Sequence, residues 1–278
     1  MRASLVLFAL LVAASVAAQP VRPNAGDREA AYADIMIPIA GHVAGANGTE
    51  FQTDLTISNT NVDALVEVYW LPQNRSGSMT TPVAILPVPA ASVVTYEDFV
   101  VRTIHQTGLG TIILRGLDNA RQRSEFVRID AYARIWTPAQ CGSGTMSQGV
   151  QASTLYGPKV DDFSPITGLV YGLRQDADFR TNIGIINMSS ERTVTFRVDI
   201  RGTKQQQQMQ LVVPPASMVH EALPPGDFGA VTLGIHVLGQ NPPPPDAFSG
   251  PPWTAFGSSV DNHSGDAWYS KAQAAYVH

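Results

Sequence analysis

The sequence predicts an all-β fold with two tandem antiparallel β-sandwich domains after a signal peptide. Three observations lead to this prediction: an internal repeat, short apolar stretches of alternating pattern bounded by turn residues, and an apolar N-terminal segment. The repeat is considered first because similar segments adopt similar structures, so a repeat sets the architecture before any local assignment.

The repeat is clearest where FQTDLTISNTNVDALVEV, from Phe51, aligns with FRTNIGIINMSSERTVTF, from Phe179. Two shorter correspondences link residues 38–41 with 165–168 and residues 89–94 with 214–219. Two copies of one β-rich unit argue against a single enzyme-like domain with a unique catalytic cleft. The identical aligned pairs are Phe51/Phe179, Thr53/Thr181, Ile57/Ile185, Asn59/Asn187 and Val66/Val194.

Alternation of apolar and polar residues predicts the strands, since successive side chains of a strand point to opposite faces. Residues 51–57, 66–70, 127–135 and 194–200 show this pattern. Turn residues recur at the spacing of short strands, which is typical of a β-sandwich. One short helix is expected within residues 96–106, and the proline-rich residues 241–252 are expected to form an exposed insertion.

Boundaries follow from the repeat and from composition. Residues 1–18 are assigned to a signal peptide, 19–33 to a flexible leader and 34–152 to the first sandwich. Residues 153–161 are assigned to a linker and 162–278 to the second sandwich. Arg2 followed by a short apolar run and small residues is typical of a secretory signal, and the run is short for the alternative, a membrane anchor.

Export therefore predicts a secreted, periplasmic or cell-surface location, with no transmembrane segment. A net charge of −5 without a basic run disfavours nucleic acid as a partner. Cys141 is the one cysteine, so no internal disulfide can form and stability must come from hydrophobic cores. Cys141 lies in a glycine- and serine-rich loop, where the alternatives are an unpaired residue or an intermolecular disulfide.

Three segments carry a family resemblance: IPIAGHVAGANGTEFQTDLTISN from Ile37, GLRQDADFRTNIGIIN from Gly172 and SSVDNHSGDAWY from Ser258. They resemble uncharacterised exported bacterial proteins with tandem Ig-like β-sandwich modules. The resemblance implies Ig-like sandwiches in an extracellular or cell-surface setting. It implies no catalytic residues, because a fold does not by itself fix a function.

One polar run is a candidate cation site. Asp261, Asn262 and Asp266 surround a glycine turn, and carboxylate and amide oxygens are ligands that Ca²⁺ prefers. The alternative, which we favour, is a tight hairpin in which Asn262 and Asp266 bond their own backbone and Gly265 takes a positive φ. We therefore expect no obligatory cofactor, with calcium as the exception to test.

Aromatic residues are the other candidates. Trp253, Trp268 and Tyr269 are candidate binding residues, since flat rings stack on sugars, and Trp253 is expected to be exposed on the proline-rich insertion. The alternative, which we favour, is packing in a core or between the sandwiches. Tyr132 and Trp136 lie opposite the apolar stripe of residues 127–135, on a face expected to be solvated or covered by the other sandwich.

No nucleophile motif or zinc spacing occurs among the serines and six histidines, so no catalytic residues are assigned. The sequence favours a non-catalytic exported structural or interaction protein that serves adhesion, surface assembly or scaffolding. The alternative is a carbohydrate-binding protein acting on extracellular glycans, and a cell-wall hydrolase ranks third. The expected partner is an extracellular protein or glycan.

Overall fold

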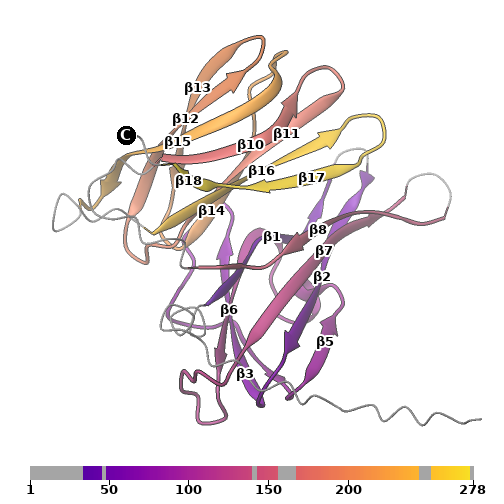
Figure 1. The fold of residues 1–278 in the computed structure, drawn as a ribbon, viewed down its shortest axis with the longest axis vertical. Helices are drawn as coiled ribbons and strands as arrows, with labels where there is room; N and C mark the ends of the chain where they lie inside the picture. The colour runs from indigo at the N-terminus through magenta and orange to yellow at the C-terminus, as the bar shows by residue number, and fades with distance from the viewer. Residues whose placement is uncertain (1–33, 46–47, 140–142, 156–166, 244–251, 276–278) are drawn as a thin grey trace, which may run out of the picture.

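The computed structural model describes residues 34–45, 48–139, 143–155, 167–243 and 252–275 (Figure 1). Its regular structure is almost entirely antiparallel strands, which confirms the predicted all-β class. The strands of the first half are β1 (Ile35–Ala44), β2 (Glu50–Asn59), β3 (Ala64–Pro72), β4 (Ala84–Val88), β5 (Ser92–Tyr96), β6 (Gly108–Leu117), β7 (Ile129–Pro138), β8 (Thr145–Gln151) and β9 (Ser153–Thr154). Those of the second half are β10 (Thr167–Gln175), β11 (Phe179–Asn187), β12 (Thr193–Gly202), β13 (Gln206–Val213), β14 (Ser217–Ala222), β15 (Gly229–Asn241), β16 (Trp253–Asp261), β17 (Ala267–Lys271) and β18 (Gln273–Ala275).

The second half repeats the strand pairing of the first. In the first half the strands pair in the orders β4-β3-β6-β1-β9 and β5-β2-β7-β8. In the second half the orders are β13-β12-β15-β10-β18 and β14-β11-β16-β17. Each pairing in the second half therefore has a counterpart in the first. One difference is that β1 also pairs with β2 through Val43 and Ala44, which joins the two sheets of the first half along that edge.

Each half buries the apolar stripe of its alternating strands between its two sheets. In the second half, Val194, Phe196, Val198 and Ile200 of β12 are fully buried and pack with apolar residues of β11, β14 and β16. At about 25 cal/mol per Å² of apolar surface removed from water, these stripes are the main favourable contribution to folding. The predicted alternation is thus the cause of the sandwich-like packing.

The repeated asparagine fixes one end of each half. Asn59 Nδ2 donates to the carbonyls of Val62, Val88 and Pro89 at 2.6, 3.0 and 3.2 Å. Asn187 Nδ2 donates to the equivalent carbonyls of Arg192, Val213 and Pro214 at 2.7, 3.1 and 2.9 Å. Both side chains are buried, so each must satisfy its donors internally. The identity Asn59/Asn187 therefore reflects a shared turn structure.

The repeated threonine fixes the register of β1 and β10. Thr53 Oγ1 donates to the Gly41 carbonyl at 2.9 Å, and Thr181 Oγ1 donates to the Arg174 carbonyl. Both pairs lie just beyond a β-bulge, which falls between Ile37 and Ala40 in one half and between Val170 and Leu173 in the other. Gly41 thus corresponds to Arg174.

This register corrects the predicted match of residues 38–41 with residues 165–168. Pro38 corresponds to Tyr171, because the bulge and the threonine anchor, rather than the short Pro-Ile motif, determine the pairing. The predicted match of residues 89–94 with 214–219 is confirmed by their turns. Ala91 and Ala216 both have positive φ, of 49° and 45°, and Ser92 and Ser217 both donate to the proline carbonyl three residues earlier.

Other predictions have mixed outcomes. The expected short helix is present as α2 (Phe99–Arg102), a single turn. Ser153 and Thr154, at the start of the predicted linker, form β9 and pair with β1. Residues 1–33, Cys141 and residues 244–251 lie outside the described residues. Within the ranges described, no helix has the length and apolar character to cross a bilayer.

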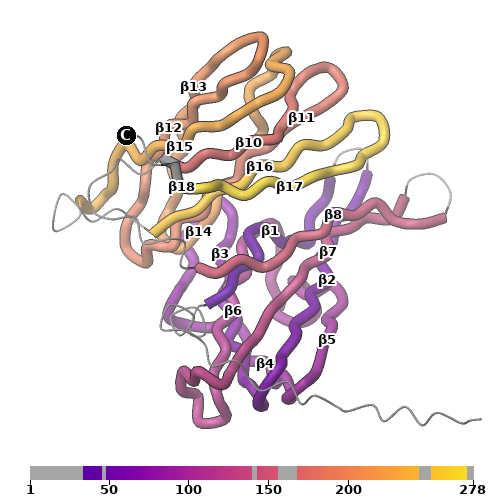
Figure 2. Tube along the Cα trace, in the orientation of Figure 1, coloured from indigo at the N-terminus to yellow at the C-terminus, as the bar shows by residue number. Residues whose placement is uncertain are grey.

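The two halves pack end to face (Figures 1 and 2). The outer face of the sheet β14-β11-β16-β17 lies across one end of the first half, where β3, β6 and β8 approach it. The backbone amides of Asn74 and Gly77 donate to the carbonyls of Met218 and Ala216 at 2.9 and 3.0 Å. Ile186, Met218 and Phe256 of this face belong to the same hydrophobic cluster as the first half's core.

Phe256 is the centre of the covered face. Its ring lies between His220 and Tyr269, with centroid separations of 5.8 and 5.5 Å. It also lies flat across Gly184, where an added Cβ would come within 2.1 Å of the ring. Phe256 is fully buried, so the glycine is required for the ring to lie between the two halves.

We predict that Gly184→Ala destabilises the protein by about 2 kcal/mol, because the new methyl group overpacks the contact with Phe256. The matched control is Gly239→Ala, since nothing lies within 4 Å of the position its Cβ would occupy. Urea unfolding of both variants checks the prediction. Equal free energies of unfolding for the two variants would contradict it.

Candidate functional site

The outer face of β5-β2-β7-β8 in the first half is the counterpart of the covered face in the second half. Strand register makes Tyr132 equivalent to Phe256 and Thr95 equivalent to His220. Val93 is likewise equivalent to Met218. Yet Val93 is 68% exposed and Tyr132 45% exposed, whereas Met218 and Phe256 are fully buried. We call the outer face of β5-β2-β7-β8 the open face.

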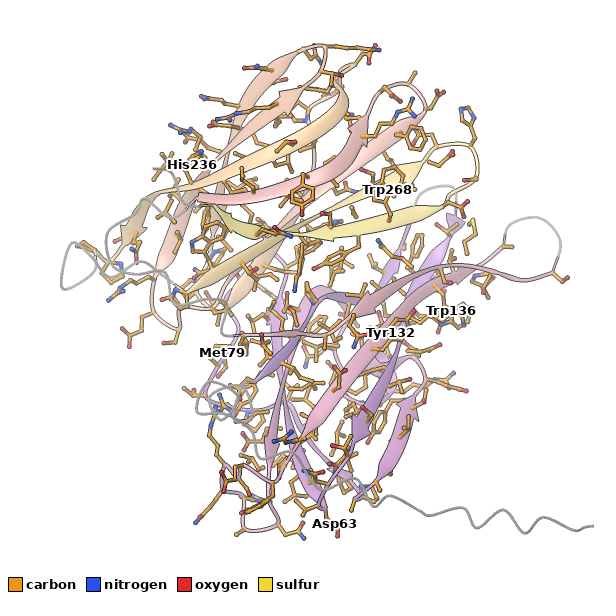
Figure 3. All side chains as sticks on the ribbon, viewed as in Figure 1. Asp63, Met79, Tyr132, Trp136, His236 and Trp268 are labelled. Carbon is orange, nitrogen blue, oxygen red and sulfur yellow. The ribbon has the colours of Figure 1, made fainter. Side chains whose placement is uncertain are left out.

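The open face carries two aromatic side chains from β7, which Figure 3 labels. Tyr132 lies across the neighbouring strand β8, because a Cβ added at Gly149 would meet its hydroxyl oxygen at 2.0 Å. The tyrosine ring is thus supported on one side by backbone. Trp136 is held by a hydrogen bond from Nε1 to Asp54 Oδ2 at 2.7 Å, and the Arg134 guanidinium lies 5.3 Å from the tryptophan ring centroid.

Polar groups surround these rings. Asp54 also accepts from the Asp98 amide through its other oxygen, at 3.0 Å. Gln151 Nε2 donates to both oxygens of Asp130 at 3.2 and 3.1 Å. The open face therefore combines an aromatic surface with fixed amide, guanidinium and carboxylate groups. Such a surface is suited to recognition of a polar partner with some apolar area.

Trp253 packs inside the second half, which is the alternative that the sequence analysis favoured, and it does not lie exposed on an insertion. It begins β16 and turns into the second half, where its ring meets Phe196 edge to face with a 5.1 Å centroid separation. Its Nε1 is buried, and an added Cβ at Gly168 would touch the ring. The proline-rich sequence suggested a loop, but the strand starts at the tryptophan itself.

Trp268 and Tyr269 point to opposite faces of β17. Trp268 Nε1 donates to the Gly172 carbonyl at 2.7 Å, and its ring packs edge to face on Phe179. Tyr269 packs on Phe256 in the contact between the halves. Both residues line a groove of about 480 Å³ between β8 and β17. The three predicted binding aromatics thus do not form one platform.

The run Asp261–Asp266 forms the hairpin between β16 and β17, with Gly265 at φ 80°. Asp261 Oδ1 accepts from the amides of His263 and Ser264 at 2.7 and 3.0 Å, and these bonds lower its pKa. Asn262 Oδ1 accepts from Arg180 at 2.8 Å. In the part of the chain described, no three acidic, histidine or cysteine side chains are grouped as metal ligands.

The predicted hairpin is present, but the side chains that bond to its backbone differ from those expected. The backbone-capping side chain is Asp261, whereas Asn262 reaches across to Arg180 and to the Ala177 carbonyl. Asp266 contributes through its backbone, whose amide donates to Ser264 Oγ at 3.1 Å. Strand position decides this, because Asp261 is the last residue of β16 and faces the turn amides.

His42 sits between two carboxylates. Its Nδ1 is 2.8 Å from Asp98 Oδ1 and its Nε2 is 2.9 Å from Glu50 Oε1. The bond to Asp98, followed by the bond to Glu50, raises the pKa of His42 above 6.5. Because both ring nitrogens are engaged, this cluster serves as an ion pair that ties β1 to β2 and to the turn before α2.

His220 is the opposite case. Its Nε2 is buried with no hydrogen-bond partner among the described residues, and burial lowers its pKa to about 4. The sequence analysis missed His220 and the covered face. The sequence did contain a signal for the covered face. The apolar and polar alternation of Leu55-Thr56-Ile57-Ser58 is lost in the equivalent run Ile183-Gly184-Ile185-Ile186, as expected of a strand buried on both faces.

Comparison of the chain with protein-family models, curated proteins and solved structures gave no significant match. The resemblance to uncharacterised exported bacterial proteins therefore stays a prediction. Function must be argued from the surfaces described above.

We predict opposite pH dependences for the two histidines. The lowered pKa of His220 gives stability that is complete above about pH 6.5 and is lost, by up to about 3 kcal/mol, as pH falls toward 4. The raised pKa of His42 gives stability that is complete below about pH 6.5 and is lost as pH rises through the folded-state pKa.

Urea unfolding of the wild type, His220→Phe and His42→Gln between pH 4.5 and 8 measures both effects. The excess in free energy of unfolding of the wild type over His220→Phe should shrink or reverse toward acid pH. The excess of the wild type over His42→Gln should grow toward acid pH. Parallel curves of unfolding free energy against pH for all three proteins would rule out both pKa shifts as the cause.

Proposed function

We propose that this chain is an exported, non-catalytic interaction protein that binds its partner through the open face. The observation that carries the proposal is the equivalence of the open face with the face that the second half uses to bind the first. A surface used for protein contact in one copy is available in the other. Binding rather than turnover is the role that such a surface serves.

The finer architecture belongs to the same proposal. We infer that the two halves are tandem Ig-like domains, supported by their nine corresponding strands and seven corresponding pairings. We further infer a signal peptide at residues 1–18 and a secreted, periplasmic or cell-surface location, supported by the charge and apolar pattern of that segment. Adhesion, surface assembly and scaffolding are the roles consistent with this setting.

Composition of the open face supports binding over simple solvation. An exposed valine on β5 and two aromatic side chains on β7 share this face, with β2 between these strands, whereas solvated sheet faces carry mostly polar residues. Aromatic residues and arginine are enriched where proteins bind one another. Tyr132, Arg134 and Trp136 supply these residue types.

A glycan is the second candidate partner, favoured by the position of Tyr132. Its ring lies over Gly149, which leaves the other ring face available for stacking on a sugar. Trp136 is less suited to stacking, because Arg134 already lies over its ring. The open face thus replaces Trp253 and Trp268 as the surface for testing glycan binding.

Site-specific photo-crosslinking in producing cells tests the proposal. A benzophenone amino acid replaces Val93 on the open face or, as the control, Val212 on the outer face of β13. The two valines are similarly exposed, at 68% and 58%. We predict adducts from position 93 and not from position 212.

Digestion of the adduct identifies the class of partner. An adduct that protease reduces to a short peptide remnant indicates a protein partner, whereas a protease-resistant adduct removed by glycosidases indicates the glycan candidate. Equal adducts from both positions, or none from position 93, would refute the open face as the binding surface.

A further inference from the structure

A cleft between the two halves, separate from the open face, has the features of a small-molecule site. Its volume is about 410 Å³. A cavity of roughly 150 Å³ lined by apolar side chains is enough to hold benzene, and ligand sites in proteins typically begin at about 300 Å³. The cleft therefore has room for a ligand with a chain or ring system larger than benzene.

The wall from the first half is apolar. Five different strands contribute to it, all at the end that meets the second half. Its large apolar side chains are Ile39, Val43, Phe51, Leu109, Ile135 and Met146, and Thr49, Ser147 and Gln148 lie at the cleft as well. All but Ile39 stay partly exposed although a second sheet lies opposite them, so this wall retains apolar surface that a ligand would remove from water.

The wall from the second half is polar. Most of its residues are polar: Arg180 and Asn182 of β11, His220 of β14, Ser258 of β16 and residues 261–264 of the following hairpin, with Val260 and Ala267 as apolar members. An apolar wall that faces polar groups cannot close into a dry contact without burying unpaired donors, which costs free energy. This mismatch accounts for the cleft between surfaces that elsewhere pack closely.

His220 supplies the observation that points to a ligand. Its ring is fixed by stacking on Phe256, with an interplanar angle of 19°, and its Nε2 is buried without a partner among the described residues. Buried polar atoms are nearly always hydrogen-bonded, so an orphan atom on a residue that lines the cleft points to a ligand or water atom that would pair with it. Since the imidazole is neutral at pH 7, it offers a hydrogen bond rather than a charge.

Arg180 supplies the charge. One of its amino groups donates to Asn262 at 2.8 Å, which orients the guanidinium at the cleft while leaving other N–H groups to bind. The acidic group nearby in the lining, Asp261, already accepts two backbone amides. His263 pairs with Asp178 at 3.1 Å, so Arg180 is the cation with donors to offer.

We propose that the cleft binds a small amphipathic carboxylate, with its apolar chain or ring on the wall of the first half and its carboxylate at Arg180 and His220. Such a ligand satisfies the orphan nitrogen, covers the partly exposed apolar wall and contacts both halves at once. It would stabilise the contact between them, because it binds the assembled cleft and not the unfolded chain.

Decanoate, decanol and decylamine are the probes, because they share one chain and differ in head group. Isothermal titration is expected to give binding of decanoate, weaker binding of decanol and none of decylamine. Arg180→Gln should weaken decanoate binding by about tenfold or more, since a charge-assisted bond is lost. Arg201→Gln, an exposed arginine on β12 outside the cleft, should leave binding unchanged.

Methyl NMR locates the bound probe. Decanoate should shift the ε-methyl signal of Met146 in the cleft wall, assigned with Met146→Leu, and leave that of Met209 on β13 unchanged. The proposal is overturned if decanoate does not bind, if decylamine binds as well, if Arg180→Gln binds like the wild type, or if the Met146 signal does not move. These outcomes are independent of photo-crosslinking at the open face.

Discussion

Burial of one sheet face organises this molecule. The outer face of β14-β11-β16-β17 would normally face water, but here Ile186, Met218 and Phe256 are fully buried against the end of the first half. Phe256 can lie flat because Gly184 has no side chain and because His220 and Tyr269 hold the ring on either side. The two halves consequently share one hydrophobic cluster.

The same contact gives the two copies different roles. In the second half this face holds the two halves together, and Ile186, Met218 and Phe256 in the contact are apolar. In the first half the equivalent positions keep Thr56, Ser58 and Thr95, with Tyr132 where the second half has Phe256. Duplication followed by divergence of one face thus leaves the open face as the surface available to a partner. The cleft lies where the apolar wall of the first half and the polar wall of the second half do not pack against each other.

Sequence patterns predicted the parts of the structure that depend on local chemistry. Alternation located the strands, and the pairs Asn59/Asn187 and Thr53/Thr181 mark hydrogen bonds that each copy must make. The bulge in β1 and β10 was not predictable, because it depends on which strand lies opposite. The loop position suggested for Trp253 was wrong, because it came from the nearby prolines, whereas the favoured alternative of core packing follows from the pairing of β16 with β11. Which face is covered depends on how the halves pack, although the unbroken apolar run at Ile185-Ile186 indicated it.

Thiol labelling at equivalent positions tests the central claim most directly. In a Cys141→Ser background, single cysteines are placed as Val93→Cys on the open face and Met218→Cys on the covered face. Their strand positions correspond, and the native residues are 68% and 0% exposed. We predict rapid labelling at position 93 and labelling at least a hundredfold slower at position 218 in the folded protein, with equal rates in denaturant. Similar rates in the folded protein would contradict the account.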